Sequence, residues 1–287
     1  MLQSLKDAFH EPSGTKSSIL QAMMSPAGLR VVWVVVEAEE DVKVYEKFMC
    51  EDSTIVKTSE SETGRRGYAN VEIIVSEIKE EVPVAHIIGI RDADYSRYKG
   101  DDNVPVNIFL TDRRDLEMML LEAETVKQEL RVWVPVFDEA FAKCIPVCRY
   151  FGYLRIYNEV ADLSVTFHKQ LTPNKYWDYQ QQTIKDSWEL DCTTRFVELS
   201  EGRCTSTDVK TFITTQKLLE ENLYDVCRGH DFLNLLSLTL IDVQRYSVEN
   251  MMAQMIKAYS KEDFKATRLY ASIQAWQTAE CVTALIA

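Results

Sequence analysis

The sequence predicts an α/β layer with a parallel sheet, followed by a mainly helical part. Two largely apolar runs, Val31–Val36 and Ala85–Ile90, lack the alternation of a half-buried strand. Runs of this kind are typical of strands buried on both faces, as the central strands of a parallel sheet are. Acidic residues follow both runs almost directly, at the strand ends where open α/β sheets bind their ligands. Past about residue 136, helix-length patterns dominate.

The elements of the first half are expected to alternate. A lead-in over residues 1–29 contains a short amphipathic piece between two turn signals, Pro12–Gly14 and Pro26–Gly28. The first buried strand leads to a helix from about Glu40 to Met49. Right-handed crossovers are expected between parallel strands. The remaining elements are, in order, a strand at 54–57, a helix near 68–79, the second buried strand, a strand at 106–110 and a helix from about 115 to 131.

The second half reads as helices packed on the first half. Gly229 is expected to be a C-cap between two of them, and Asp231 the N-cap of the next. We therefore expect a lead-in at 1–29, an α/β domain at 30–135 and a mainly helical domain at 136–287. The expected helices of the last part include 141–159, 207–228, 232–259 and 261–285.

Charge and cysteine usage narrow the class of protein. The net charge of −13 argues against a general nucleic-acid coat protein, because affinity for phosphate backbones comes from cations. A local basic patch remains compatible with an enzyme that acts on nucleic acid. Seven scattered cysteines, with no apolar leader and no membrane-spanning window, predict a soluble cytoplasmic protein with reduced thiols. The candidate phosphate-binding residues are Arg65, Arg66, Arg91, Arg113 and Arg114.

Three acidic clusters follow three predicted strands. Glu37 and Asp41 follow the first, Asp92 and Asp94 the second, and a group that ends in Glu117 the third. Such carboxylates repel one another unless a cation compensates. Oxygen ligands without His or Cys favour Mg²⁺ or Mn²⁺. We therefore predict a metal site built from Glu37, Asp41, Asp92, Asp94 and Glu117, with Glu37, Asp92 and Asp94 catalytic.

Each cluster also has a structural interpretation. Asp41 could be a first-turn acid that favours the helix dipole, and Asp92-Ala93-Asp94 could be an Asp-rich turn. Thr111 or Asp112 as an N-cap, with Asp115 one turn later, would explain the aspartates of the third cluster. No phosphate-binding P-loop, dinucleotide fingerprint or nucleophile elbow is present. Divalent ions held by the acidic side chains could polarise a phosphodiester and lower the pKa of a bound water, and the nearby arginines would bind phosphate.

The acidic motifs resemble those of a TOPRIM domain. Glu37-Ala38-Glu39-Glu40-Asp41 resembles its Glu-Gly-x-x-Asp opening, and Asp92-Ala93-Asp94 its Asp-x-Asp. Leu110–Glu117 is similar to the third acidic motif of nucleases of the overcoming-lysogenisation-defect type. Three later segments also look familiar: Gly152–Arg155, Phe167–Lys169 and Gly229–Asp231. Together with the acidic motifs, they make the chain similar to the TOPRIM effectors of PARIS-type anti-phage systems.

The resemblance implies a TOPRIM-like sheet and a function. Glu37 would be the catalytic glutamate, Asp92 and Asp94 the metal-binding pair, and Glu117 the distal ligand. Such effectors are toxic, metal-dependent endonucleases that an ATPase partner holds inactive, with tRNA more expected than DNA as substrate. Ala38 departs from the family's usual Gly and puts the turn geometry in question, because a methyl group disfavours left-handed backbone.

Other interpretations remain open. One is a TOPRIM nuclease directed at DNA. Another is a degenerate binding or partner subunit that holds no ion, for which Ala38 is the best support. A homodimer is also expected to be possible, because few basic residues surround the acidic site and a second subunit could complete a groove.

Overall fold

A computed structural model describes residues 12–59, 67–100, 104–168, 170–240 and 245–286. Its contacts divide the chain into two units. The first, here called the α/β unit, combines residues 1–93, 102–112 and 260–287, and the second, the helical unit, combines residues 94–101 and 113–259. This division differs from the predicted one. Residues 94–101 and 113–135 belong to the helical unit, and residues 260–287 belong to the α/β unit.

The α/β unit is built on a four-stranded parallel sheet in the order β2-β1-β3-β4. Both central strands are entirely buried, as their apolar runs predicted. Neighbouring strands pair Val34 with Val56 and with Ile88, and Ile90 with Phe109. The strands are β1 (Val32–Val36), β2 (Thr54–Thr58), β3 (Ile87–Arg91) and β4 (Ile108–Leu110).

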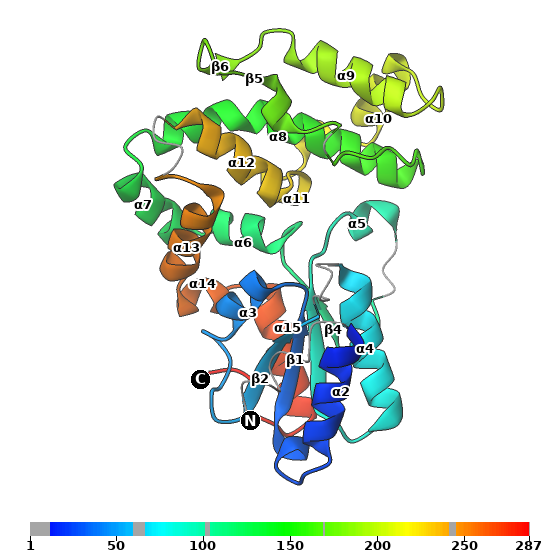
Figure 1. Cartoon of the computed structure of the whole chain (residues 1–287), viewed down its shortest axis with the longest axis vertical. Coiled ribbons are helices and arrows are strands. Elements are labelled where there is room, and N and C mark those ends of the chain that lie inside the picture. The colour runs from blue at the N-terminus through cyan, green and yellow to red at the C-terminus, as the bar shows by residue number, and fades with distance from the viewer. Residues whose placement is uncertain (1–11, 60–66, 101–103, 169, 241–244, 287) are drawn as a thin grey trace. The chain divides into compact units, whose positions relative to one another are not determined.

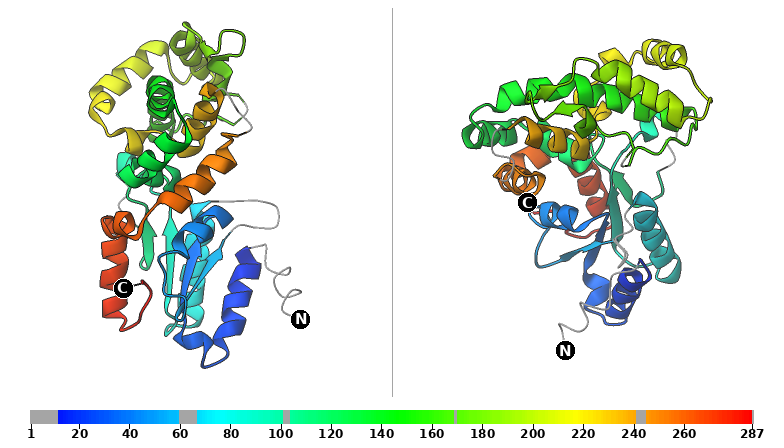
Figure 2. Two further views of the ribbon diagram at one scale, coloured as in Figure 1. Left: turned by 90° about the vertical axis from the view of Figure 1, so that its left-hand side faces the viewer. Right: turned by 45° about the horizontal axis from the view of Figure 1, so that its top comes forward.

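Helices cover both faces of this sheet (Figures 1 and 2). On one face, α2 (Pro12–Met23) and α4 (Tyr68–Glu81) pack on a core that includes Trp33, Val35 and Ile87. Gly89 of β3 allows α4 to approach, since a Cβ there would come within 2.6 Å of both Val71 and Ile108. The other helices of the unit are η1 (Gly28–Arg30), α3 (Glu39–Tyr45), α14 (Lys261–Lys265) and α15 (Arg268–Ala279), of which α15 lies on the face opposite α2.

The C-terminal segment is an integral part of this unit. Ala284 accepts a hydrogen bond from the N–H of Cys50 at 2.7 Å, and Ile286 donates one to Phe48 at 2.9 Å. Phe264 of α14 stacks on Phe48, with ring centroids 4.6 Å apart. The C-terminal segment therefore packs against the chain between α3 and β2.

The helical unit is organised around α8 (Phe137–Val160), a 24-residue helix. Around it pack α9 (Trp188–Leu199), α10 (Ser206–Thr215), α11 (Leu223–Val226) and α12 (Gly229–Thr239). The other elements are α5 (Ser96–Lys99), α6 (Leu116–Glu122), α7 (Glu124–Trp133), η2 (Pro173–Tyr176), β5 (Trp177–Asp178), β6 (Thr183–Ile184), η3 (Leu218–Glu220) and α13 (Val248–Ala258). The predicted α/β class, with a parallel sheet flanked by helices and a helical second part, is confirmed.

Several expected helices are shorter than predicted. The helix expected at 115–131 is two helices, because Ala123 takes extended backbone with φ −61° and ψ 130°. The helix expected at 207–228 breaks at Lys217, which has a left-handed φ of 52°. The helix expected from Glu40 to Met49 ends at Tyr45. Helical periodicity continued through each break, so the pattern alone did not reveal where the backbone leaves the helix.

Candidate acidic site

Glu37 and Asp92 meet at the carboxyl edge of the sheet. Glu37 follows β1 and Asp92 follows β3, and these two strands are hydrogen-bonded neighbours. The main-chain N–H of Asp92 donates to Oε1 of Glu37 over 3.0 Å. Both residues are partly exposed. Of the predicted site residues, these are the two that the α/β unit brings together.

The backbone around Glu37 is held by the neighbouring strand. The N–H of Ser59 donates to the carbonyl of Val36 at 2.7 Å, and the Thr58 hydroxyl donates to the carbonyl of Glu37 at 3.3 Å. These bonds extend the β1–β2 pairing one step past the strands. The turn that carries Glu37 is therefore fixed from both sides, by β2 and by Asp92.

Asp41 supports the start of α3. Its Oδ2 accepts the N–H of Ala38 at 3.0 Å, which satisfies a main-chain donor at the helix N-terminus. This contact agrees with the structural interpretation of Asp41, and its role as a metal ligand stays a prediction. Ala38 itself has φ −137° and ψ 168°, which is ordinary extended backbone. A methyl group is compatible with that conformation, so the change from Gly does not strain the turn.

Asp94 belongs to the helical unit, whose boundary with the α/β unit falls after Ala93. Its φ of 44° is left-handed, three residues after β3 ends at Arg91. Its N–H donates to the carbonyl of Arg114 at 2.8 Å, and its Oδ1 accepts from Nη2 of Arg114 at 3.2 Å. Its side chain is 44% exposed. Ala93 is buried, and its N–H donates to the Thr111 hydroxyl.

The aspartates of the third cluster cap helices, but not in the predicted arrangement. Neither Thr111 nor Asp112 is the N-cap of α6; Asp115 is, and it accepts the N–H of Met118 at 3.0 Å. Asp112 instead accepts the first two N–H groups of α15, those of Arg268 at 2.7 Å and Leu269 at 2.8 Å. The prediction that these aspartates cap helices is confirmed, but the helix each one caps was predicted wrongly.

Glu117 lies against the start of α12. A Cβ on Gly229 would come within 2.4 Å of the Glu117 Cβ, so the absence of a side chain at 229 lets the two helices touch. Gly229 is therefore the first residue of α12 and not a C-cap, and Asp231 lies inside the helix, bound to Arg155 at 2.7 Å. The ligand role of Glu117 stays a prediction.

The described arginines of the predicted phosphate site are all paired with carboxylates. Arg91 binds Glu72 at 2.7 Å and lies over the ring of Tyr68. Arg113 binds Glu122 through two nitrogens, and this hydrogen bonding raises the pKa of the Arg113 guanidinium. The phosphate-binding role of each stays a prediction, and Arg65 and Arg66 lie outside the described residues.

Arg114 is the most enclosed of these arginines. Its guanidinium is 7% exposed, bridges Asp115 at 2.5 Å and Asp94 at 3.2 Å, and lies over the ring of Tyr95. Asp115 in turn accepts the N–H of Gly229. This network was not expected from the sequence, because its members come from three separate segments. The sequence Arg114-Asp115 directly before an apolar helix could have indicated a capping aspartate paired with an arginine.

The described residues show no complete metal site. Among them, no three His, Cys, Asp or Glu side chains form a metal-binding group. Mg²⁺ in proteins commonly keeps several waters and binds through one or two carboxylates, so its binding by Glu37 and Asp92 stays a prediction. The N–H of Asp92 fixes one oxygen of Glu37, which orients the carboxylate before any ligand arrives.

Comparison with known proteins adds no relative. No protein-family model matches the chain, and no curated protein matches it. In the part of the chain that the structure describes, every helix is too short or too polar to cross a lipid bilayer.

Proposed function

We propose that this chain is a divalent-metal-dependent nuclease of the TOPRIM type, with Glu37 and Asp92 in its catalytic site. The observation that carries the proposal is the hydrogen bond from Asp92 N–H to Glu37 Oε1, 3.0 Å long. It supports the proposal because two acids from neighbouring parallel strands lie together at the edge where open α/β sheets bind ligands.

Glu37 and Asp92 would hold the ion. When bound, Mg²⁺ or Mn²⁺ would polarise a phosphodiester and lower the pKa of a water molecule. The chain's own contribution is orientation: Asp92 N–H holds the Glu37 carboxylate, and the Thr58 hydroxyl holds the Glu37 carbonyl. Asp41, Asp94 and Glu117 are proposed further ligands on the basis of the resemblance alone.

The substrate and setting of the proposed reaction also rest on the resemblance. The chain would be the toxic effector of an anti-phage system, cleaving tRNA rather than DNA in the cytoplasm. An ATPase partner would hold it inactive, and two copies could associate to cut.

A second candidate is a partner subunit without catalysis. The observation that favours it is the ion pair of Asp94 with Arg114, because a guanidinium already neutralises one of the predicted metal ligands. Calorimetric titration with Mn²⁺ separates the two candidates. Saturable binding that disappears in a Glu37→Gln variant supports the nuclease, and a folded protein that takes up no Mn²⁺ supports the partner subunit.

The test of catalysis uses a matched pair of variants. Glu37→Gln keeps the shape of the side chain and removes its charge, and Glu39→Gln makes the same change at an exposed residue two positions away. Glu37→Gln should reduce Mg²⁺-dependent cleavage by about 100-fold or more, and Glu39→Gln should leave it unchanged. Sequencing of RNA and DNA ends after induced expression identifies the substrate. Equal activity of the two variants would exclude Glu37 from the chemistry.

A further inference from the structure

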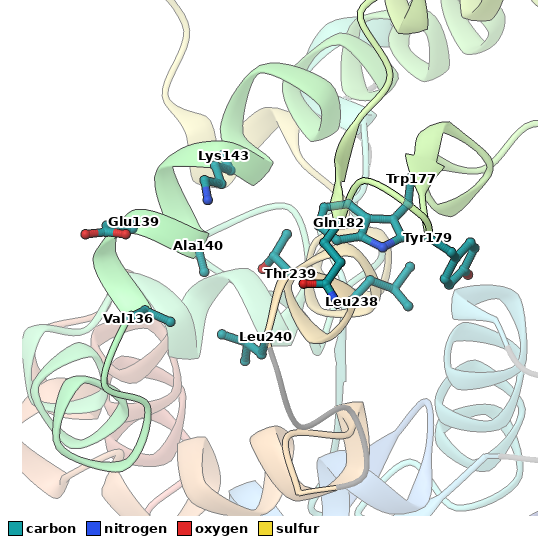
Figure 3. A pocket seen from close by; sticks show the side chains of 10 residues that line it. All are labelled: Val136, Glu139, Ala140, Lys143, Trp177, Tyr179, Gln182, Leu238, Thr239 and Leu240. Atoms are coloured by element: carbon teal, nitrogen blue, oxygen red, sulfur yellow. The ribbon is translucent and has the colours of Figure 1, made fainter.

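A cavity of about 320 Å³ in the helical unit supplies no group to the proposed site (Figure 3). It lies between the first turns of α8, the β5–β6 hairpin and the last turn of α12. Its walls include Trp177, Ala140 and Leu240, which are each at most 6% exposed and therefore covered by protein. Neither Glu37 nor Asp92 lines it. The contacts that hold these two acids come from the α/β unit instead.

Both peptide groups that flank the Cα of Asp92 are fully hydrogen-bonded. In the peptide before it, the Asp92 N–H donates to Glu37 Oε1 at 3.0 Å. The carbonyl of the same peptide, that of Arg91, accepts the N–H of Thr111 at 3.0 Å. In the peptide after it, the Ala93 N–H donates to the Thr111 hydroxyl at 3.0 Å. The Asp92 carbonyl accepts from Nη1 of Arg91, also at 3.0 Å. These bonds fix the planes of both peptides, and with them the direction in which the Asp92 side chain leaves the backbone.

Thr111 contributes to both of these peptides from the end of β4. Its N–H continues the pairing of β3 with β4 by one residue beyond Leu110, where β4 ends. Its hydroxyl reaches the next amide along the neighbouring chain, that of Ala93. Thr111 and Ala93 are each 4% exposed, so little solvent is present to replace the hydroxyl as an acceptor.

Arg91 holds the Asp92 carbonyl with a guanidinium that is itself held in place. Arg91 is 8% exposed, and its Nε lies 2.7 Å from a carboxylate oxygen of Glu72 on α4. The guanidinium also lies over the ring of Tyr68, 4.8 Å from the ring centroid. A guanidinium enclosed in this way must break its ion pair before it can turn toward a phosphate. The arrangement therefore favours support of Asp92 over the predicted contact with phosphate.

We propose that Thr111 and Arg91 are positioning residues of the acidic pair. They hold the Asp92 main chain so that the Asp92 and Glu37 carboxylates keep one relative orientation, and the effect on catalysis rests on the proposed function. Groups that are fixed before a ligand arrives lose little entropy when they bind it. Removing a hydrogen-bond partner behind a metal ligand typically lowers metal affinity by about 10–100-fold.

The main test replaces the Thr111 hydroxyl by a methyl group. Thr111→Val keeps the shape of the side chain and leaves the Ala93 N–H without its acceptor, whereas Thr111→Ser keeps the hydroxyl. Thr54→Val is the control. Thr54 is also buried in the same sheet, but its hydroxyl donates to the carbonyl of Ala284 at the start of β2.

Two measurements are made on the full-length chain. Hydrogen exchange without metal, resolved by NMR, should be about 10-fold faster at the Asp92 and Ala93 amides in Thr111→Val, the change expected for one lost hydrogen bond. Calorimetric titration should show an affinity for Mn²⁺ about 10-fold lower in the same variant. Thr111→Ser and Thr54→Val should match the natural chain in both measurements.

Arg91→Lys tests the second residue. A single ammonium keeps the charge but cannot hold both Glu72 and the Asp92 carbonyl in the same geometry. The Asp92 amide should again exchange about 10-fold faster, and nucleic-acid cleavage should show a kcat about 10-fold lower with an unchanged KM. A higher KM with an unchanged kcat would assign Arg91 to phosphate binding and overturn its positioning role.

Other results would overturn the role of Thr111. Unchanged exchange at the Asp92 amide in Thr111→Val would show that the hydroxyl does not hold the acidic pair, and faster exchange with an unchanged Mn²⁺ affinity would limit Thr111 to a structural contact. Absence of Mn²⁺ binding by the natural chain would overturn the proposed function instead, and the exchange rates would then decide the positioning role alone. Circular dichroism confirms that each variant is folded before it is compared.

Discussion

Asp115 and Gly229, which are 114 residues apart in the sequence, are joined by a hydrogen bond of 2.9 Å from the glycine N–H to the aspartate Oδ2. The other oxygen of Asp115 accepts the N–H of Met118, so one buried carboxylate serves the N-termini of both α6 and α12. Helix N-termini carry partial positive charge, and a carboxylate between two of them is stabilising.

Replacement of Asp115 by Asn should be strongly destabilising. The amide loses the charge that pairs with Arg114 and leaves that guanidinium buried without its closest partner. Breaking a buried pair from one side costs about 3–5 kcal/mol, and urea denaturation measures the loss. Asp138→Asn is the control, because Asp138 pairs with Arg131 at the surface and should cost less than about 1 kcal/mol. Similar losses in both variants would contradict the bridging role of Asp115.

Gly229→Ala should separate α6 from α12. The new methyl group would lie 2.4 Å from the Glu117 Cβ and 2.7 Å from Asp115 Oδ1, so one helix must move. We expect a loss of about 1–3 kcal/mol by urea denaturation, and a smaller loss when Glu117 is first changed to Gly. Gly100→Ala is the comparison, because its Cβ would meet open space and only its φ of 66° opposes the change. If Gly229→Ala lowers the free energy of unfolding equally in the natural chain and in the Glu117→Gly variant, a clash with the Glu117 side chain is not the cause.

Ala38→Gly tests whether the departure from the TOPRIM motif impairs the site. Because Ala38 already has extended backbone, a glycine offers no conformational advantage in the folded state. It should increase the entropy of the unfolded chain and reduce stability by about 0.4–1 kcal/mol, without raising nuclease activity or Mn²⁺ affinity. Thermal unfolding and calorimetry measure the two effects. A gain of metal binding or cleavage in Ala38→Gly would show that the natural alanine weakens the site.

The buried thiol of Cys144 should be inert in the native protein. Burial raises the pKa of Cys144 to about 12, so the thiol stays protonated between pH 7 and pH 9. Since the thiolate is the reactive form, its alkylation should not increase over this range until the protein unfolds. Exposed Cys281 should react throughout. Peptide mass spectrometry after iodoacetamide treatment, with and without urea, resolves the two sites; rapid native labelling of Cys144 would contradict its burial.

The parts of the fold that the sequence predicted are those with local signals. The apolar runs identified β1 and β3, because a strand buried on both faces has apolar residues at consecutive positions. The same reasoning placed Glu37 and Asp92 at one edge of the sheet, where the structure has them. Helix α4 was also located closely, because its apolar residues keep one period throughout.

The parts that the sequence did not predict depend on distant partners. Asp112 was expected to cap a helix nearby, yet the amides it accepts belong to α15, 156 and 157 residues away. Nothing close to Asp112 in the sequence indicates that partner. The same holds for Asp115 with Gly229 and for the β5–β6 hairpin, whose strands of two residues are too short to show alternation.

The return of the C-terminal segment to the sheet has a consequence for synthesis. Cys50 and Phe48 receive main-chain partners from Ala284 and Ile286, so the α/β unit cannot be completed on the ribosome until residues 260–286 have emerged. All four strands end by Leu110, so they are translated long before the segment that bonds to Cys50 and Phe48. A product truncated before residue 260 would lack these hydrogen bonds and the Phe264–Phe48 stack, which should lower the stability of the α/β unit.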